Sequence, residues 1–211
     1  METTNVEEMI SNEEKEFVTE VSPVFTKISG WLSSAEAAAL FFLARSLGNL
    51  PNVVEIGSYV GKSSVVLGLA VKPLQGRVYC VDPFDVDYLD FKGSRLVTFL
   101  RNIREVGLLN ICVPYSGTSA ERVRGWKTPI DMLFIDGDHQ YEAVKQDYLL
   151  WTPYLRDGGI LAMHDVDLPG DPWPPTDEGP GLVARELIFP SDEWPDVERI
   201  DRLLVARKKA Q

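Results

Sequence analysis

Short, continuously apolar segments alternate with helical patterns between residues 52 and 165, and this order constrains the fold more than any other feature. Apolar residues in these segments do not alternate with polar ones, which is typical of strands buried on both faces. The alternation with helices predicts parallel βα units. Strands are expected at 52–56, 77–82, 110–115, 130–136 and 158–165. Helices are expected at 33–48, 61–72, 91–107, 119–126 and 141–155.

The chain changes character after Asp165. A Pro- and Gly-rich segment at 167–181 is expected to lack regular structure, and a helix is expected at 182–189. The closing sequence VERIDRLLVARKK predicts two strands at the sheet edge, at least one of them antiparallel. The expected fold is therefore α/β: a doubly wound, mostly parallel seven-stranded sheet, Rossmann-like, with helices on both faces and an antiparallel C-terminal edge.

The bulk properties of the chain limit its organisation and partners. Its 211 residues, 45% hydrophobic, fit one core, with an acidic N-terminal extension at 1–30 before a single domain at 31–211. The net charge of −11 argues against nucleic acid as a partner. No apolar run reaches membrane-spanning length, and no signal peptide is recognisable. Cys80 and Cys112 lie in apolar runs, so buried reduced thiols and a cytoplasmic location are expected.

Polar residues collect where the predicted strands end. Glu55 and Asp82 end the first two strands, Asp136 ends the fourth, and His164 and Asp165 end the fifth. Each has a local structural explanation, such as a turn or a helix cap. Because the carboxyl ends of parallel strands share one edge of the sheet, their coincidence predicts a ligand crevice there.

The loop EIGSYVGKSS, residues 55–64, is the most informative segment. Gly57 permits a tight turn out of the strand, and Gly61 permits a ligand to approach the backbone at the start of the next helix. The spacing differs from the G-x-G-x-x-G of dinucleotide-binding loops. A P-loop would require glycine at position 56, where Ile stands.

Three motifs together resemble one family. EIGSYVGKS is similar to the cofactor loop of class I S-adenosylmethionine-dependent methyltransferases, especially the catechol O-methyltransferase kind. FIDGDHQYEAVKQD, WTPYLRDGGILAMHD and GWLSSAEA resemble the branch that methylates sugars of macrolide and aminocoumarin antibiotics. The resemblance covers residues 30–166.

The resemblance implies a set of cofactor contacts. Asp82 would hold the ribose hydroxyls, Ser119 would lie at the adenine edge, and Asp136 would stand between cofactor and metal. The remaining contacts would come from the loop, with Glu55 supporting it and the methionine part bound by Gly57, Ser58, Tyr59, Gly61 and Ser63.

The resemblance also implies a divalent metal, Mg²⁺ or Mn²⁺, held by Asp136, His164 and Asp165. Magnesium prefers oxygen ligands, so His164 either binds a transition metal or only orders the crevice by hydrogen bonds. Asp138 is the first candidate for the general base and His139 the second. The alternative role of His139 is a contact at the start of a helix.

The expected activity is O-methylation of a small-molecule hydroxyl on a sugar, polyketide or phenol, by in-line attack on the sulfonium methyl group. The segment 167–181, with Trp173, is interpreted as a substrate-side wall; the alternatives are a surface loop or a homo-oligomer contact. Three other hypotheses remain: a nicotinamide-dependent oxidoreductase, a catalytically silent S-adenosylmethionine-binding module, and metal-independent methyl transfer.

Overall fold

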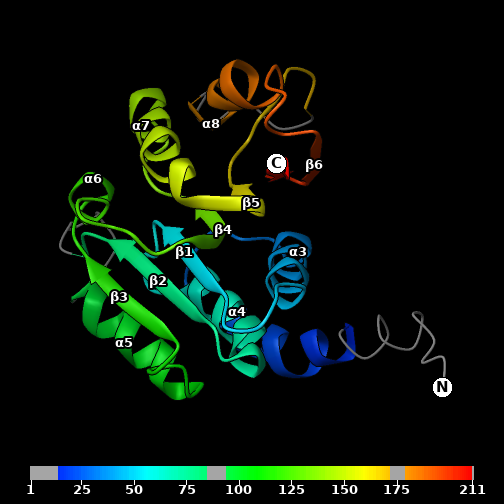
Figure 1. Ribbon diagram of the computed structural model, residues 1–211. Coiled ribbons are helices and arrows are strands. Elements are labelled where there is room, and N and C mark those ends of the chain that lie inside the picture. Colours follow the sequence, from blue (N-terminus) through cyan, green and yellow to red (C-terminus); the bar gives the residue numbers. More distant parts are fainter. Residues whose placement is uncertain (1–13, 85–93, 172–178, 211) are drawn as a thin grey trace.

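The computed structural model describes residues 14–84, 94–171 and 179–210, and a seven-stranded sheet lies at its centre (Figure 1). The strand order is β3-β2-β1-β4-β5-β7-β6. Strands β1 to β5 are parallel, and β7 runs antiparallel between β5 and β6. The strand bounds are β1 Asn52–Ile56, β2 Arg77–Asp82, β3 Cys112–Ser116, β4 Ile130–Ile135, β5 Leu155–Met163, β6 Asp196–Ile200 and β7 Leu203–Arg207. The predicted fold class is confirmed, and the order reverses between β1 and β4, where such folds bind ligands.

Helices cover both faces of the sheet and make three layers (Figure 1). On one face, Phe41 and Phe99 belong to the core beneath α3, α4 and α5. On the other face, Trp151 and Val183 belong to the core beneath α7 and α8. The helical bounds are η1 Phe17–Val21, α2 Ser22–Phe25, α3 Ser34–Arg45, α4 Lys62–Val71, η2 Lys72–Leu74, α5 Arg95–Glu105, α6 Ser119–Arg122, α7 Tyr141–Trp151, η3 Thr152–Tyr154, α8 Gly179–Val183 and η4 Ala184–Ile188.

The described part of the N-terminal segment packs on the first of these cores. Phe17 and Phe25 are buried in the same cluster as residues of α3 and α4. Lys62 donates from Nζ to the carbonyl oxygen of Ile28 at 3.1 Å and lies 5.2 Å from the ring centroid of Phe25. Lys62 thus binds the N-terminal segment.

The segment at 167–181 departs from its prediction. Helix α8 begins at Gly179, so the expectation that regular structure is absent up to residue 181 was wrong. A Cβ atom on Gly179 would lie 1.9 Å from the His139 carbonyl oxygen, and one on Gly181 would lie 2.2 Å from that of Asp167. The glycines therefore permit the helix to approach two backbone segments closely, instead of marking a loop. Trp173 lies outside the described residues.

Two expectations from composition concern the thiols and the membrane. Cys80 and Cys112 are both buried and free, which confirms reduced, buried thiols. Among the described residues, none of the helices has the length and apolarity that crossing a bilayer requires.

Candidate functional site

The loop after β1 lies against the loop after β4. Gly57 has a φ of +90°, and a Cβ atom on it would lie 2.0 Å from the carbonyl oxygen of Asp136. The backbone N–H of Asp136 donates to the carbonyl of Ile56 at 2.8 Å. Only glycine tolerates this backbone conformation and this close approach together. Gly61, with a φ of +92°, then caps the start of α4. The β1 loop is therefore held directly beside Asp136.

Glu55 stabilises this loop through hydrogen bonds. Its side chain is fully buried, and Oε2 accepts hydrogen bonds from the hydroxyl of Ser58, at 2.7 Å, and from that of Ser64. Burial raises the pKa of Glu55. Ser63, in the first turn of α4, is buried as well. The position of Glu55 suits the loop-supporting role that the sequence predicts for it.

Asp82, the predicted ribose ligand, is tied to the same loop. One carboxylate oxygen accepts from the backbone N–H of Tyr59 at 2.8 Å, and the other accepts from that of Phe84 at 2.7 Å. Burial raises the pKa of Asp82. The ring centroid of Tyr59 is 6.0 Å from that of Trp31 and 5.1 Å from the guanidinium carbon of Arg95. The structure thus brings together Glu55, Asp82 and the β1 loop.

Ser119 lies at the start of α6 and contacts α7. Its hydroxyl oxygen accepts from Trp151 Nε1 at 2.7 Å. Ser119 also hydrogen-bonds the buried carboxyl group of Asp147, whose pKa burial raises to about 6. Sequence reasoning missed Asp147. A signal was present, because Asp147 falls at helical spacing between Val144 and Trp151, on the buried face of α7.

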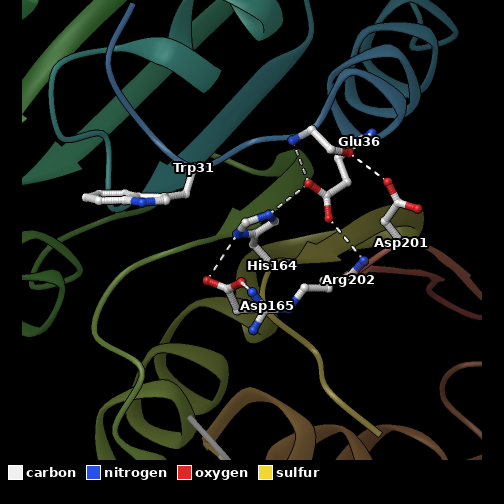
Figure 2. A pocket seen from close by; sticks show the side chains of 7 residues that line it. Trp31, Glu36, His164, Asp165, Asp201 and Arg202 are labelled. Carbon is white, nitrogen blue, oxygen red and sulfur yellow. Dashed lines mark hydrogen bonds and ion pairs between the residues drawn. The ribbon is translucent and has the colours of Figure 1, made fainter. Parts of the chain in front are cut away.

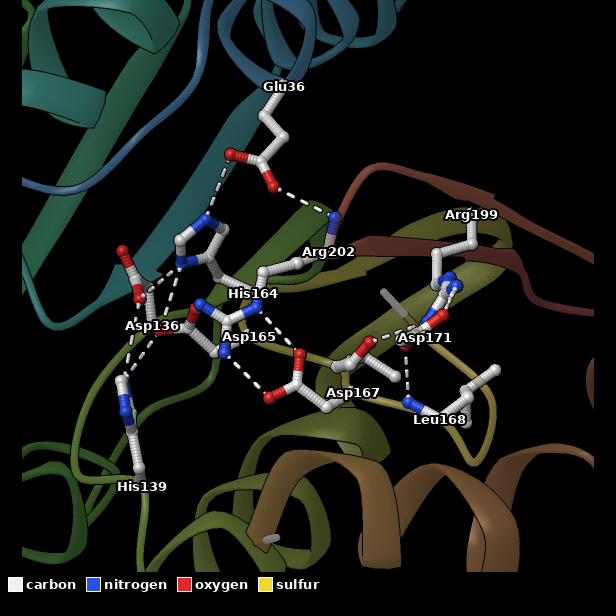
Figure 3. A network of polar contacts seen from close by, with 11 residues as sticks. Glu36, Asp136, His139, His164, Asp165, Asp167, Leu168, Asp171, Arg199 and Arg202 are labelled. Atoms are coloured by element: carbon white, nitrogen blue, oxygen red, sulfur yellow. Dashed lines mark hydrogen bonds and ion pairs between the residues drawn. The ribbon is translucent and has the colours of Figure 1, made fainter. Parts of the chain in front are cut away.

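Three predicted residues gather into a cluster that could hold a metal ion. Asp136, His139 and Asp165 each offer one ligand atom, and these atoms lie within 4.8 Å of one another. His139 Nε2 is 3.1 Å from Asp165 Oδ2 and 4.0 Å from Asp136 Oδ1 (Figure 3). The sequence proposed His139 as a base and His164 as a ligand. In the structure, the third atom of this group comes from His139.

His164 lies beneath these carboxylates and is almost fully buried. Its Nδ1 is 3.1 Å from Asp136 Oδ1 and 3.3 Å from Asp165 Oδ2, and its Nε2 is 3.1 Å from Glu36 Oε2. Burial by itself lowers the pKa of His164, but the charge and hydrogen bond of Asp136, with contacts from Asp165 and Glu36, raise it to about 12. Each ring nitrogen therefore faces a carboxylate oxygen at hydrogen-bond distance. Its role as a direct ligand stays a prediction.

The backbone of Asp165 explains how two consecutive side chains reach one site. Successive side chains of a strand point to opposite faces of the sheet. Asp165 has a φ of +56°, in the left-handed region, just after β5 ends. This turn breaks the alternation, so the carboxylate of Asp165 lies 3.3 Å from the ring of His164. Such backbone conformations are uncommon outside glycine and collect at functional sites.

Glu36 and Arg202 complete the network (Figure 3), and sequence reasoning gave neither a functional role. Ser33 and Glu36 form a capping box at the start of α3. Beyond it, Glu36 Oε1 accepts from the backbone N–H of Arg202 at 3.0 Å. The Arg202 guanidinium donates to Asp165 at 2.6 Å and to both oxygens of Asp167 at 2.7 and 2.8 Å. These contacts join residues that are distant in sequence, so no local sequence motif predicts them.

Asp138, the first candidate for the base, is exposed and directly precedes His139 in the sequence. Its Oδ1 accepts from the backbone N–H of Gln140 at 2.9 Å, just before α7 begins. This contact is a local turn of the kind that Asp favours. The catalytic role of Asp138 stays a prediction.

A cavity of about 380 Å³ opens beside His164 and Asp165 (Figure 2). Its walls come from both ends of the chain: the segment before α3 and the turn between β6 and β7. Trp31 borders it with a side chain that is 81% exposed. The lining residues are Trp31, Ser33, Glu36, His164, Asp165, Asp201 and Arg202.

Solved structures of methyltransferases share this fold. The O-methyltransferase TomG of Streptomyces achromogenes, involved in tomaymycin synthesis and solved with S-adenosylmethionine, is 19% identical with a TM-score of 0.69, over 95% of this chain and 96% of that one. An O-methyltransferase of Bacillus cereus, solved with S-adenosylhomocysteine, is 16% identical with a TM-score of 0.69, over 94% and 97%. An rRNA methylase of Streptococcus thermophilus is 15% identical with a TM-score of 0.60, over 86% and 100%.

Sequence comparisons give the family. An uncharacterized protein of Acanthamoeba polyphaga mimivirus is 50% identical over 36 residues, which are 17% of this chain and 16% of that protein. The model of the methyltransferase domain family matches residues 54–166, more than half of the chain. That span runs from β1 to the end of β5 and contains the β1 loop, Asp82 and the Asp136, His139 and Asp165 cluster. The chain therefore belongs to the methyltransferase domain family.

Proposed function

We propose that this protein is an S-adenosylmethionine-dependent O-methyltransferase that modifies a hydroxyl group of a small molecule with the help of a divalent cation. The observation that carries the proposal is one convergence. The glycine turn after β1, Asp82 at the end of β2, and the cluster of Asp136, His139 and Asp165 meet at the carboxyl edge of the sheet, at its switch point.

The cofactor would lie along the β1 loop. Gly61 begins α4 with a positive φ, and the first amide groups of a helix favour an anionic group such as the methionine carboxylate. Asp82 reaches the loop through Tyr59, and its oxygens retain lone pairs for the two ribose hydroxyls. The complexes of TomG and of the Bacillus cereus enzyme support S-adenosylmethionine as the cofactor.

The donor set of the cluster fits a divalent cation. Two carboxylates and an imidazole offer atoms within 4.8 Å of one another, and mixed oxygen and nitrogen ligands favour Mn²⁺ or another transition metal over Mg²⁺. A divalent cation at this site would lower the pKa of an acceptor hydroxyl and neutralise the developing oxyanion. His139 would complete the ligand set beside Asp136 and Asp165.

The residues of the chain would align the reaction and take the proton. The β1 loop and Asp136 share a backbone contact, so a cofactor on the loop and an acceptor at the cluster would be held in fixed relation. This positioning lowers the barrier to in-line transfer because the reacting atoms no longer search for their geometry. Asp138, exposed beside the cluster, is the proposed proton acceptor, from which the proton can pass to water.

The cavity beside the cluster is the proposed acceptor site, and its charges select against anions. Among the described residues that line it, Arg202 is the one arginine, and it already donates to Asp165 and Asp167. The carboxylates of Glu36, Asp165 and Asp201 line the walls, and Trp31 presents an aromatic face. We therefore favour a neutral or cationic hydroxyl compound with one apolar face, such as a sugar or phenol. A net charge of −11 disfavours RNA, although one structure of similar fold is an rRNA methylase.

Calorimetric titration with S-adenosylhomocysteine, with and without Mn²⁺ or Mg²⁺, is the first test, followed by mass spectrometry of a panel of hydroxyl compounds and rRNA incubated with S-adenosylmethionine. Cofactor binding and a mass gain of one methyl group on a small molecule are expected. Methylation of rRNA alone would refute the acceptor class. Tight cofactor binding without any product would favour a catalytically silent module.

A further inference from the structure

Glu36 lies behind the cation cluster but belongs to an element remote from it in sequence. It is in the first turn of α3, 128 residues before His164, and its side chain is only 4% exposed. A buried carboxylate is costly unless hydrogen bonds compensate its charge. Oε2 accepts from the backbone N–H of Ser33 at 2.9 Å and faces His164 Nε2 at 3.1 Å, while Oε1 accepts from the backbone N–H of Arg202.

The contact with His164 fixes how that ring faces the cluster. With Nε2 directed at Glu36, Nδ1 points at Asp136 and Asp165, at 3.1 and 3.3 Å. The ring thereby holds two carboxylates of like charge at one place. Without Glu36, the buried Nε2 would lose its acceptor, and the ring could turn toward other partners or water. Groups one shell behind a metal orient its ligands in this manner.

Glu36 also connects the cluster to the walls of the cavity. Ser33 and Arg202 both line the cavity, and both donate backbone N–H groups to Glu36. Figures 2 and 3 show the carboxylate between the start of α3, the ring of His164 and the turn before β7. One buried group thus joins three segments that are distant in sequence.

We propose that Glu36 is a positioning residue for the cation site: by accepting a hydrogen bond from His164, it holds that ring so that Asp136 and Asp165 keep the geometry that binds a divalent cation. The inference rests on the proposed function, because it presumes that the cluster binds a cation. It assigns Glu36 no contact with cation, cofactor or acceptor.

The competing explanation is that Glu36 only caps α3. Ser33→Ala separates the two roles, since it removes the hydroxyl that accepts from the Glu36 backbone N–H but leaves the Glu36 carboxylate and its contact with His164. Loss of the helix cap would lower the melting temperature of both Ser33→Ala and Glu36→Ala. Loss of the His164 contact occurs only when Glu36 is replaced.

The test measures Mn²⁺ affinity by electron paramagnetic resonance, which reports free Mn²⁺ without requiring turnover, in the full chain with S-adenosylhomocysteine present. Glu36→Ala should weaken Mn²⁺ binding by about ten-fold or more, the usual cost of losing such a group. Ser33→Ala should change it by less than about two-fold, although its melting temperature falls. Glu36→Gln can keep an oxygen toward His164 and should recover most of the affinity.

A double-mutant cycle with His164→Ala decides whether the effect passes through the ring. If it does, Glu36→Ala adds little further loss once His164 is absent. Equal losses with and without His164, a Glu36→Gln variant as weak as Glu36→Ala, or an equal loss in Ser33→Ala would each overturn the inference. S-adenosylhomocysteine affinity measured on each variant identifies a protein that has failed to fold. A wild-type protein that binds no Mn²⁺ would instead refute the cation part of the proposed function, and this inference with it.

Discussion

The buried carboxyl group of Asp147, which hydrogen-bonds Ser119, allows a quantitative test of how burial changes its pKa. Its side chain is 7% exposed, and burial raises its pKa from 3.8 to about 6. A carboxyl group whose pKa is higher in the folded state stabilises the fold fully below the unfolded pKa, and this contribution is lost as pH rises through the folded pKa. The relevant window therefore runs from about pH 4 to pH 6.

The size of the effect follows from the shift. A pKa difference of about two units between the folded and unfolded states changes the free energy of unfolding by about 3 kcal/mol between the acid limit and neutral pH. Asp147→Asn removes the charge, retains the shape and can still hydrogen-bond Ser119. The free energy of unfolding of Asp147→Asn minus that of wild type should be about 2–3 kcal/mol more favourable to the variant at pH 7.5 than at pH 4.

Urea denaturation of both proteins at pH 4, 5, 6 and 7.5 measures this difference directly. Asp157→Asn, which removes an exposed carboxyl group of β5, is the matched control for the loss of one charge. If the stability difference between Asp147→Asn and wild type is the same at pH 4 and at pH 7.5, burial does not govern this carboxyl group and the reasoning fails.

Three further predictions concern the site itself. Gly57→Ala should weaken S-adenosylhomocysteine binding by about ten-fold or more in calorimetry, since its Cβ would lie 2.0 Å from the Asp136 carbonyl oxygen, whereas Gly48→Ala, with nothing within 4 Å, should bind normally. An unchanged affinity in Gly57→Ala would place the cofactor elsewhere. Asp138→Asn should retain cofactor affinity but lose about 99% of kcat, and full turnover in this variant would remove Asp138 as the base. EDTA should abolish product formation and added Mn²⁺ should restore it; activity that survives the chelator would support metal-independent transfer.

Much of the architecture could be predicted because each parallel βα unit leaves a local pattern in the sequence, an apolar run followed by a helical pattern. The expected strands at 52–56 and 77–82 match β1 and β2 at both ends. Other boundaries moved for local reasons. The helix expected over 141–155 ends at Trp151 because Pro153 cannot donate to the preceding turn, and the next strand begins at Leu155. The helix expected at 182–189 begins three residues earlier, at Gly179, because the glycines there serve close packing, which composition alone indicates as loop.

The sequence by itself determined the sheet, the glycine turn after β1, and which strand ends carry Glu55, Asp82 and Asp136, because these depend on periodicity and on neighbouring residues. Only the tertiary structure decided that His139 joins Asp136 and Asp165, while His164 turns its second nitrogen to Glu36. The physical reason is sequence separation: Glu36 contacts His164 from one end of the chain, and Arg202 contacts Glu36 and Asp165 from the other. Such contacts depend on how whole elements pack, and no local pattern of residues encodes them.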